Sequence, residues 1–470
     1  MKSKKIVHFI GIGGIGMSGI AELMHDQGYL IQGSDLKIND NIKRLKKRGM
    51  KIFLKHKKSN IKNISVAVYS SAVNNLNPEI LECKRLAIPL VRRADMLAEL
   101  MRGKKAIAVA GSHGKTTTTS LVGSILDYAK LDPTIINGGI INAYSKNNRF
   151  GSGKWVVAEA DESDGSFVKL PHEINIITNI DIEHLEHYKN EKNLIKAFEN
   201  FITTMPFYGY SIICFENENL KKLSKKIKDK KFIKYSSKSK NVDVHILNIK
   251  TVAKYTNFTL LIKKNIIQNV SGKFNFKINL LGKHNVLNAT ASIIASILAG
   301  VKIEKIQSSL ENFLGVKRRF TYVGKINKSF IYDDYAHHPT EIKASYQVAR
   351  LMKKKKIIVV FQPHRYSRTS ILYKDFIKVL KTINILFILD IYSAGEKPIK
   401  NINSKKLTKD LKKKNKLVYY LSNKSNIYKK LSPFFNDENL IVFMGAGSIT
   451  YEAYKLIKHN KNVQKNFRTI

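Results

Sequence analysis

The chain has 470 residues, of which 43 % are hydrophobic and 25 % are charged. This length suits two to four domains with ordinary cores, and this composition excludes collagen, large-scale disorder and a disulfide-rich scaffold. The two cysteines, Cys83 and Cys214, are far apart in sequence, which argues against a structural zinc site and for a reducing compartment.

Basic residues dominate the charge, because 82 lysines and arginines face 36 acidic residues and leave a net charge of +46. Such a balance is typical of proteins that bind nucleic acids. However, only 13 of the basic residues are arginine, and the lysines are spread along the whole chain. Isoleucine and asparagine are abundant too, as an A/T-rich genome would produce. We therefore expect no nucleic-acid partner, although a basic surface helps to attract nucleotide phosphates.

The first residues resemble a secretory signal peptide, because lysines precede an apolar run. Five glycines interrupt that run and no small-residue cleavage site follows, which favours a strand and a glycine turn instead. No apolar stretch reaches about 18 residues, so we expect no membrane insertion. The sequence predicts a cytoplasmic protein.

Three blocks of alternating strand-like and helix-like segments follow one another, at residues 1–103, 104–320 and 321–470. The alternation predicts an α/β fold with parallel sheets and short connections between domains. Within the second block, the lysine-rich stretch 221–279 is expected to form short strands and surface loops.

A glycine-rich turn follows the first predicted strand, residues 6–10. Its pattern is G-x-G-x-x-G, formed by Gly11, Gly13 and Gly16 with Gly14 between them, and a helix is expected after it. The glycines permit a tight turn, a close approach of a pyrophosphate and close packing of helix and strand. Asp35 follows the next strand, where an acid that binds a ribose would lie. The motif is compatible with binding of NAD, FAD or a UDP-sugar. The alternative interpretation is a glycine-rich turn that binds no ligand.

A second glycine loop, from Gly111 to Thr117, lies between the strand 106–110 and a helix. Such a loop holds phosphates with its backbone N–H groups, while Lys115 adds a charge and the Thr116 hydroxyl can bind Mg²⁺. The usual spacing would place glycine at 109, where this chain has Val109.

Acidic residues gather after the next two strands. Glu159 ends the strand 155–159, and with Thr116 it offers oxygen ligands of the kind that Mg²⁺ prefers. After the strand 174–180, spacing alone favours a surface histidine at His184, among neighbouring charges.

Six motifs together carry a family resemblance: GIGGIGMSGIAE, AVAGSHGKTTTTS, EADESDGSF, GKHNVLNA, DDYAHHPTE and FQPHRYSRT. In this order they resemble the Mur ligases of peptidoglycan synthesis, from residue 8 to about residue 449. The resemblance implies an N-terminal Rossmann-like domain that binds a UDP-sugar, a central P-loop ATPase-type α/β domain, and a C-terminal Rossmann-like domain that closes on the site.

The resemblance also implies the reaction. ATP, with Mg²⁺, would activate the lactyl carboxylate of UDP-N-acetylmuramate as an acyl phosphate, and the amine of L-alanine would then attack it, giving ADP and phosphate. A monomer or a homodimer is expected. The sequence identifies no dedicated general base, since water or a histidine such as His337 could accept the proton.

Individual roles follow from the matched motifs. The catalytic set is Lys115, Glu159, His184 and Arg319, and the metal set is Thr116, Glu159 and His184, which reverses the interpretation of His184 from spacing. The ATP set is Gly111, Ser112, His113, Gly114, Lys115, Thr116, Thr117, Asn285, Asn288, Arg319 and Asp334. The UDP-sugar set is Gly11, Gly13, Gly14, Gly16, Asp35, Tyr335, His337, Arg365 and Arg368.

The chain departs from the family pattern at a few positions. Ser112 stands where the family often has threonine, and Glu183 and Glu186 flank His184 where aspartates are common. The longer acids change the geometry around a metal there. Three alternatives remain: a relative that ligates a preformed peptide, an NAD-dependent oxidoreductase, and a P-loop nucleic-acid protein.

Overall fold

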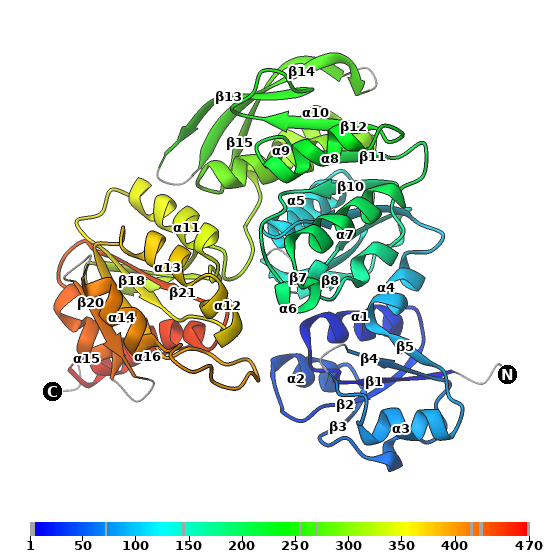
Figure 1. Cartoon of the computed structure of the whole chain (residues 1–470), viewed down its shortest axis with the longest axis horizontal. Helices are drawn as coiled ribbons and strands as arrows, with labels where there is room; N and C mark the ends of the chain where they lie inside the picture. Colours follow the sequence, from blue (N-terminus) through cyan, green and yellow to red (C-terminus); the bar gives the residue numbers. More distant parts are fainter. Residues whose placement is uncertain are drawn as a thin grey trace. The chain divides into compact units, whose positions relative to one another are not determined.

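The structure is a computed structural model that describes residues 5–70, 73–142, 146–252, 255–267, 270–413, 417–422 and 426–467. The chain divides into two compact units. Unit 1 comprises residues 1–250, 256–279 and 285–314, and unit 2 comprises 251–255, 280–284 and 315–470. Three β-sheets with helices between their strands follow one another along the chain, as the sequence predicts (Figure 1).

The first sheet has five parallel strands in the order β3-β2-β1-β4-β5. Its strands are β1 (Ile6–Ile10), β2 (Leu30–Ser34), β3 (Lys51–Phe53), β4 (Val66–Tyr69) and β5 (Leu90–Arg92). Its helices are α1 (Ile15–Asp26), α2 (Asp40–Lys47), η1 (Lys58–Asn60), α3 (Pro78–Arg85) and α4 (Arg93–Met101). From β1 the chain adds β2 and β3 on one side and then β4 and β5 on the other. The glycine turn after β1 therefore lies at the switch point, where doubly wound sheets bind ligands.

A buried polar network joins β1, β2, η1 and α3 of this sheet. The carboxylate of Glu79 accepts hydrogen bonds from Ser34 Oγ and Asn60 Nδ2, both at 2.5 Å, and lies 3.4 Å from His8 Nε2. Burial by itself would raise the pKa of Glu79, but the bonds from His8, Ser34 and Asn60 lower that pKa to about 2. The fully buried carboxylate is therefore held in its charged form.

The second sheet has ten strands in the order β15-β14-β13-β12-β11-β10-β6-β9-β7-β8. Its strands are β6 (Lys105–Ala110), β7 (Thr134–Ile141), β8 (Lys146–Arg149), β9 (Trp155–Glu159), β10 (Ile174–Ile177), β11 (Tyr210–Cys214), β12 (Phe232–Ser236), β13 (Val244–Thr251), β14 (Thr256–Ile267) and β15 (Val270–Ile278). Its helices are α5 (Lys115–Tyr128), η2 (Glu162–Asp164), η3 (Ser166–Lys169), α6 (Leu185–Tyr188), α7 (Glu191–Thr203), α8 (Glu218–Lys226), α9 (Lys283–Leu298) and α10 (Ile303–Glu311).

The lysine-rich stretch differs from the expectation of short strands and loops. It begins with the end of α8, and β14 then runs for 12 residues as an antiparallel partner of β15. Phe258, Leu260 and Ile262 alternate along β14 and are buried, and Phe258 stacks on Phe276 of β15. Lys263 and Lys264 in the second half of β14, and Lys273 and Lys277 in β15, give this segment the composition of a loop and hide its strand pattern.

The third sheet has six strands in the order β16-β17-β21-β18-β19-β20 and lies in unit 2. Its strands are β16 (Thr321–Ile326), β17 (Ser329–Asp334), β18 (Ile357–Phe361), β19 (Ile385–Leu389), β20 (Val418–Leu421) and β21 (Leu440–Met444). Its helices are α11 (Pro339–Leu351), α12 (Tyr366–Ile371), α13 (Tyr373–Leu380), α14 (Ser404–Lys412), α15 (Ile427–Leu431), η4 (Ser432–Phe434) and α16 (Ile449–Phe467).

Apolar clusters pack on both faces of this third sheet. The strands β18, β19 and β21 are almost entirely apolar and buried, as expected for parallel strands covered by helices. In the part of the chain that the structure describes, we find no helix with the length and apolar character that a bilayer span requires.

Candidate active site

The glycine turn between β1 and α1 is held by the residues that follow β2. Gly11 adopts a positive φ of 81°, which a residue with a side chain would adopt only under strain. The N–H of Gly13 donates to Asp35 Oδ2 at 2.8 Å, and Asn39 Nδ2 donates to the carbonyl of Gly13 at 3.0 Å. The structure thus brings Asp35 and the glycine turn together, as the sequence predicts, with the carboxylate bonded to the turn itself.

The phosphate loop between β6 and α5 owes its shape to two glycines with positive φ, Gly111 at 127° and Gly114 at 86°. A Cβ atom on Gly111 would lie 2.2 Å from Thr178 Oγ1, and one on Gly114 would lie 2.6 Å from Asn288 Oδ1. Asn288 also donates a long hydrogen bond of 3.5 Å to Asn285. Asn288, in the second turn of α9, therefore lies directly against the loop.

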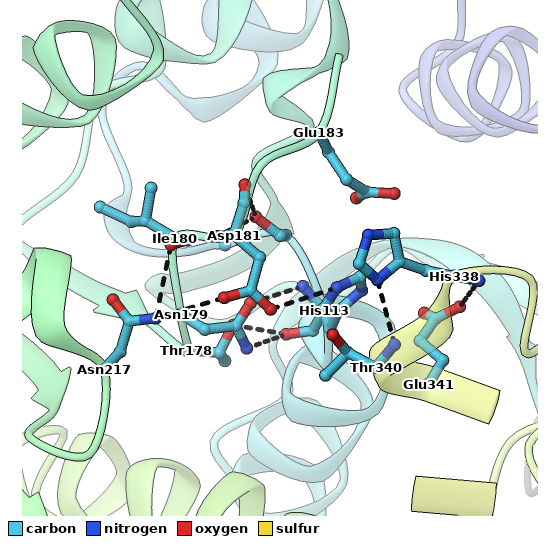
Figure 2. Close-up of polar contacts among 12 residues, drawn as sticks. His113, Thr178, Asn179, Ile180, Asp181, Glu183, Asn217, His338, Thr340 and Glu341 are labelled. Atoms are coloured by element: carbon cyan, nitrogen blue, oxygen red, sulfur yellow. Dashed lines mark hydrogen bonds and ion pairs between the residues drawn. The ribbon is translucent and has the colours of Figure 1, made fainter. Parts of the chain in front are cut away.

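A second set of bonds fixes the loop to the segment after β10 (Figure 2). The carbonyl of His113 accepts from Thr178 Oγ1 at 2.5 Å and from Asn179 Nδ2 at 3.0 Å, while Asn179 Oδ1 accepts from the His113 N–H. His113 Nε2 lies 3.4 Å from Asp181 Oδ2. Burial raises the pKa of Asp181, and the neighbouring His113 counteracts that rise. His113 is thus part of a tightly bonded support for the loop.

Ser112 completes this support through its hydroxyl group. The hydroxyl donates to the carbonyl of Asp181 and accepts from the Asp181 N–H, at 3.1 and 2.9 Å. A threonine offers the same donor and acceptor, so this departure from the family pattern preserves the contact.

Lys115 is the first residue of α5, and its side chain is mostly buried, with 13 % exposed. Nζ donates to the carbonyl of Gly111 at 2.6 Å and forms an ion pair with Glu162 Oε2 at 2.8 Å. Burial would lower the pKa of Lys115, but the carboxylates of Glu162, Asp161 and Glu159 raise that pKa above its ordinary value. The lysine is therefore a fixed positive charge at the phosphate loop.

Glu162, Glu183 and His184 form the group of ligand-type side chains near Lys115, with ligand atoms within 4.8 Å of one another. His184 Nε2 lies 3.8 Å from Glu162 Oε1 and 4.0 Å from Glu183 Oε2. Glu159, which the sequence places with His184, accepts a bond of 2.8 Å from the N–H of Gly138. The observed group and the metal set expected from the sequence therefore share His184 but differ in their acids.

In unit 2, predicted residues gather where β17 ends. The guanidinium groups of Arg318 and Arg319 lie over the ring of Tyr335, 4.7 and 5.2 Å from its centroid. Asp334 accepts hydrogen bonds from the N–H groups of Phe320 and Ala336. Burial raises the pKa of Asp334 to about 6. The structure thus places Arg319, Asp334 and Tyr335 in one cluster.

A second cluster of unit 2 follows β18. Arg368 donates to His364 Nδ1 at 3.2 Å, and the His364 ring contacts the rings of His337 and Tyr392. Burial lowers the pKa of His364 to about 3, with help from His337 and the arginines nearby, so this imidazole is neutral. Arg365 adopts a φ of 70°, the strained backbone that often marks functional positions.

Several residues of these clusters were not singled out from the sequence: Glu162, His364, Tyr392 and Glu396. Glu396 accepts from Ser367 Oγ at 2.6 Å and lies 4.0 Å from Arg365 Nη1. Glu162 and His364 lie inside the quoted motifs, directly after a predicted strand, and this position could have marked them as candidate site residues. Glu396 lies in a loop without such a signal.

Comparisons with known proteins match the chain to three family models in order. The Mur ligase family catalytic domain matches residues 6–105, the Mur ligase middle domain matches 109–296, and the Mur ligase glutamate ligase domain matches 318–447.

Full-length relatives support the same family. A UDP-N-acetylmuramate–L-alanine ligase of Rickettsia felis is 45 % identical over 96 % of this chain and 95 % of its own, and one of Sinorhizobium fredii is 43 % identical over 97 % of both. The crystal structure of a UDP-N-acetylmuramate–alanine ligase from Thermotoga maritima covers 97 % of this chain and 99 % of its own with a TM-score of 0.82 at 28 % identity. From these matches, the chain belongs to the Mur ligase family.

Proposed function

We propose that this ligase joins L-alanine to the lactyl carboxylate of UDP-N-acetylmuramate, with conversion of ATP to ADP and phosphate, in peptidoglycan precursor synthesis. Full-length relatives at 43 to 45 % identity carry names that state these two substrates. The observation that carries the proposal is the buried Lys115–Glu162 pair at the phosphate loop, beside Glu183 and His184.

The reaction proceeds by two substitutions. A lactyl carboxylate oxygen attacks the γ-phosphorus of ATP and ADP leaves, which gives an acyl phosphate. The L-alanine nitrogen then attacks the carbonyl carbon, the C–O bond to phosphate breaks, and the ammonium proton passes to water or to a histidine such as His337. The site must bring several anions together, so fixed positive charge is its main requirement. Lys115 supplies such a charge in unit 1, and Arg319 supplies one in unit 2.

The acids near Lys115 fit Mg²⁺, because carboxylate oxygens are its preferred protein ligands. Glu159, Glu162, Glu183 and His184, with the hydroxyl of Thr116, are the residues that would hold the ion. When bound, Mg²⁺ neutralises phosphate charge. Glu162 would then have two roles, because it would hold the ion and it also forms the ion pair that fixes the ammonium group of Lys115.

The phosphate loop, from Gly111 to Thr117, binds the ATP phosphates in this proposal, and Asn285 and Asn288 contact its adenine side. Asn288 lies against Gly114, which supports a role beside the loop. Asp334 contacts the ATP ribose.

The glycine turn with Asp35 binds the UDP part of the sugar nucleotide. Tyr335, His337, Arg365 and Arg368 act on the reacting end of the substrates. Their clustering after β17 and β18 supports a shared role, since ligands of parallel sheets bind where strands end.

The chain's organisation follows the same proposal. We place the UDP-sugar domain at residues 1–103, the ATP-binding domain at 104–320 and the C-terminal domain at 321–470. The enzyme works in the cytoplasm as a monomer or a homodimer.

Phosphate release from ATP tests the substrates. With Mg²⁺ and UDP-N-acetylmuramate present, L-alanine should stimulate release far more than glycine, serine or a tripeptide. Stimulation by the tripeptide instead would show a ligase for preformed peptides. Reduction of NAD by the purified enzyme, without ATP turnover, would overturn the proposal.

A further inference from the structure

Arg93, the first residue of α4, packs against the start of α1. A Cβ atom built on Gly16 would lie 3.1 Å from Arg93 Nη1 and 3.3 Å from its Cδ. The third glycine of the turn therefore makes room for a guanidinium group, whereas the sequence suggested that it makes room for a strand. Both helices belong to the first α/β block (Figure 1).

The position of this cation is electrostatically unusual. The start of a helix carries a partial positive charge and favours anions, so a guanidinium group there is repelled. Gly14 caps α1 without a side chain, and the first turn of α1 contains no acidic residue that would offset the repulsion. An anion that contacts both the N–H groups at the helix start and Arg93 would satisfy both.

Arg93 also reaches toward the acids at the end of β9. Its Nη2 lies 3.9 Å from Asp161 Oδ2, beyond hydrogen-bonding distance. The Arg93 side chain is 20 % exposed. The charge is thus largely shielded from water and lies between Gly16 and Asp161.

We propose that Arg93 binds the diphosphate of the UDP-sugar, together with the N–H groups at the start of α1. This inference rests on the proposed function and adds a named side chain to it. The guanidinium group of Arg93 lies beside Gly16 of the glycine turn on one side and near Asp161 on the other. Asp161 directly precedes Glu162, the partner of Lys115, so Arg93 lies between the glycine turn and the acids near the phosphate loop.

Equilibrium binding measured by calorimetry, without turnover, tests the role of Arg93. The probes are UDP, which carries the diphosphate, uridine, which lacks it, and ATP. Arg93→Ala should weaken UDP binding by about 10- to 100-fold, the effect of losing a charge-assisted hydrogen bond. Uridine and ATP affinities should change less than threefold, and Arg93→Lys should restore part of the UDP affinity.

Arg102→Ala is the matched control, because Arg102 caps the other end of α4, is exposed and pairs with Glu99. It should bind UDP as the wild type does. Gly16→Ala, which displaces the guanidinium group, should weaken UDP binding in the same direction as Arg93→Ala.

The outcomes separate the two proposals. If the wild type binds UDP and Arg93→Ala binds it within twofold, the role of Arg93 is overturned and the proposed function stands. Equal losses for UDP and uridine, with a lower melting temperature, would show that Arg93 only packs α4 against α1. If the wild type binds neither UDP nor UDP-N-acetylmuramate, the proposed function itself fails.

Discussion

The ammonium group of Lys115 has two kinds of partner: the loop carbonyls of Gly111 and Ser112, and the carboxylate of Glu162. The neighbouring acids keep this lysine charged at every pH at which the fold is expected to persist. Its role in the proposed reaction is therefore that of a constant charge, and it does not transfer a proton.

Replacing Lys115 with alanine tests that role. We expect turnover to fall by about 10²- to 10³-fold, the usual cost of losing one group that stabilises charge in the transition state. Binding of UDP should stay as in the wild type, because the glycine turn belongs to a different sheet. Phosphate release and calorimetry measure the two effects, with Lys105→Ala as the control. Activity within tenfold of the wild type would contradict the phosphate-loop assignment.

The acids around His184 allow a second prediction. Glu159, expected from the sequence, and Glu183, found beside His184, should each contribute to holding Mg²⁺. Glu159→Gln and Glu183→Gln should each raise the Mg²⁺ concentration for half-maximal activity by about 10-fold or more. Glu218→Gln serves as the control, since that side chain is 72 % exposed and pairs with Lys221. Magnesium titrations of Glu183→Gln that match the wild type would remove Glu183 from the site.

These residues also show what a sequence can and cannot predict. The contact of Asp35 with the glycine turn is local to one βαβ unit, where spacing determines position. Glu162 and His184 are 22 residues apart in the sequence, on loops after two different strands, and only the pairing of β6 with both β9 and β10 brings those loops together. The stacking of His364 on Tyr392 likewise depends on strand neighbours.

At the scale of elements, periodicity predicted the parallel strands well, because buried strands such as β18 and β21 are continuous apolar runs. It underestimated the length of β14 and β15, where exposed lysines such as Lys263, Lys264 and Lys273 resemble a loop. The buried network around Glu79 was not expected either, since its members come from four elements of the first sheet.

Glu79 provides a prediction for the stability of this sheet. Its pKa of about 2, against an ordinary 4.5, means that the folded state holds the proton more weakly than the unfolded chain. The carboxylate therefore stabilises the fold above pH 4.5, by about 3 kcal/mol, and this contribution disappears as the pH falls from 4.5 toward 2.

Glu79→Gln should accordingly lower the free energy of unfolding at pH 7 and differ less from the wild type near pH 3. Urea denaturation at both pH values measures the difference. Glu99→Gln, at a half-exposed position, is the control and should be neutral. A difference between Glu79→Gln and the wild type that is independent of pH would show that shape, and not charge, explains the loss.

At the scale of the whole molecule, the net charge of +46 acts on substrates of unequal charge. ATP and UDP-N-acetylmuramate are anions, while L-alanine is a zwitterion. A basic surface speeds the encounter with anions, and salt suppresses this effect because the Debye length shrinks from about 10 Å at 0.1 M to about 3 Å at 1 M.

Raising the KCl concentration over this range should lower kcat/KM for the two nucleotides by about tenfold and leave that for L-alanine within about twofold. Steady-state assays with one substrate varied at a time measure the three values. An equal decrease for all three substrates would indicate a general effect of salt on the enzyme, with no contribution from electrostatic attraction.

β15 is the outer strand of the ten-stranded sheet, so the backbone groups along one side of it lie at a sheet edge. This strand carries Lys273 and Lys277. Such an edge invites a strand from a second molecule, and repulsion between like charges makes that approach unfavourable. An excess of lysine that arose from biased codons would thus keep concentrated enzyme from aggregating through this edge.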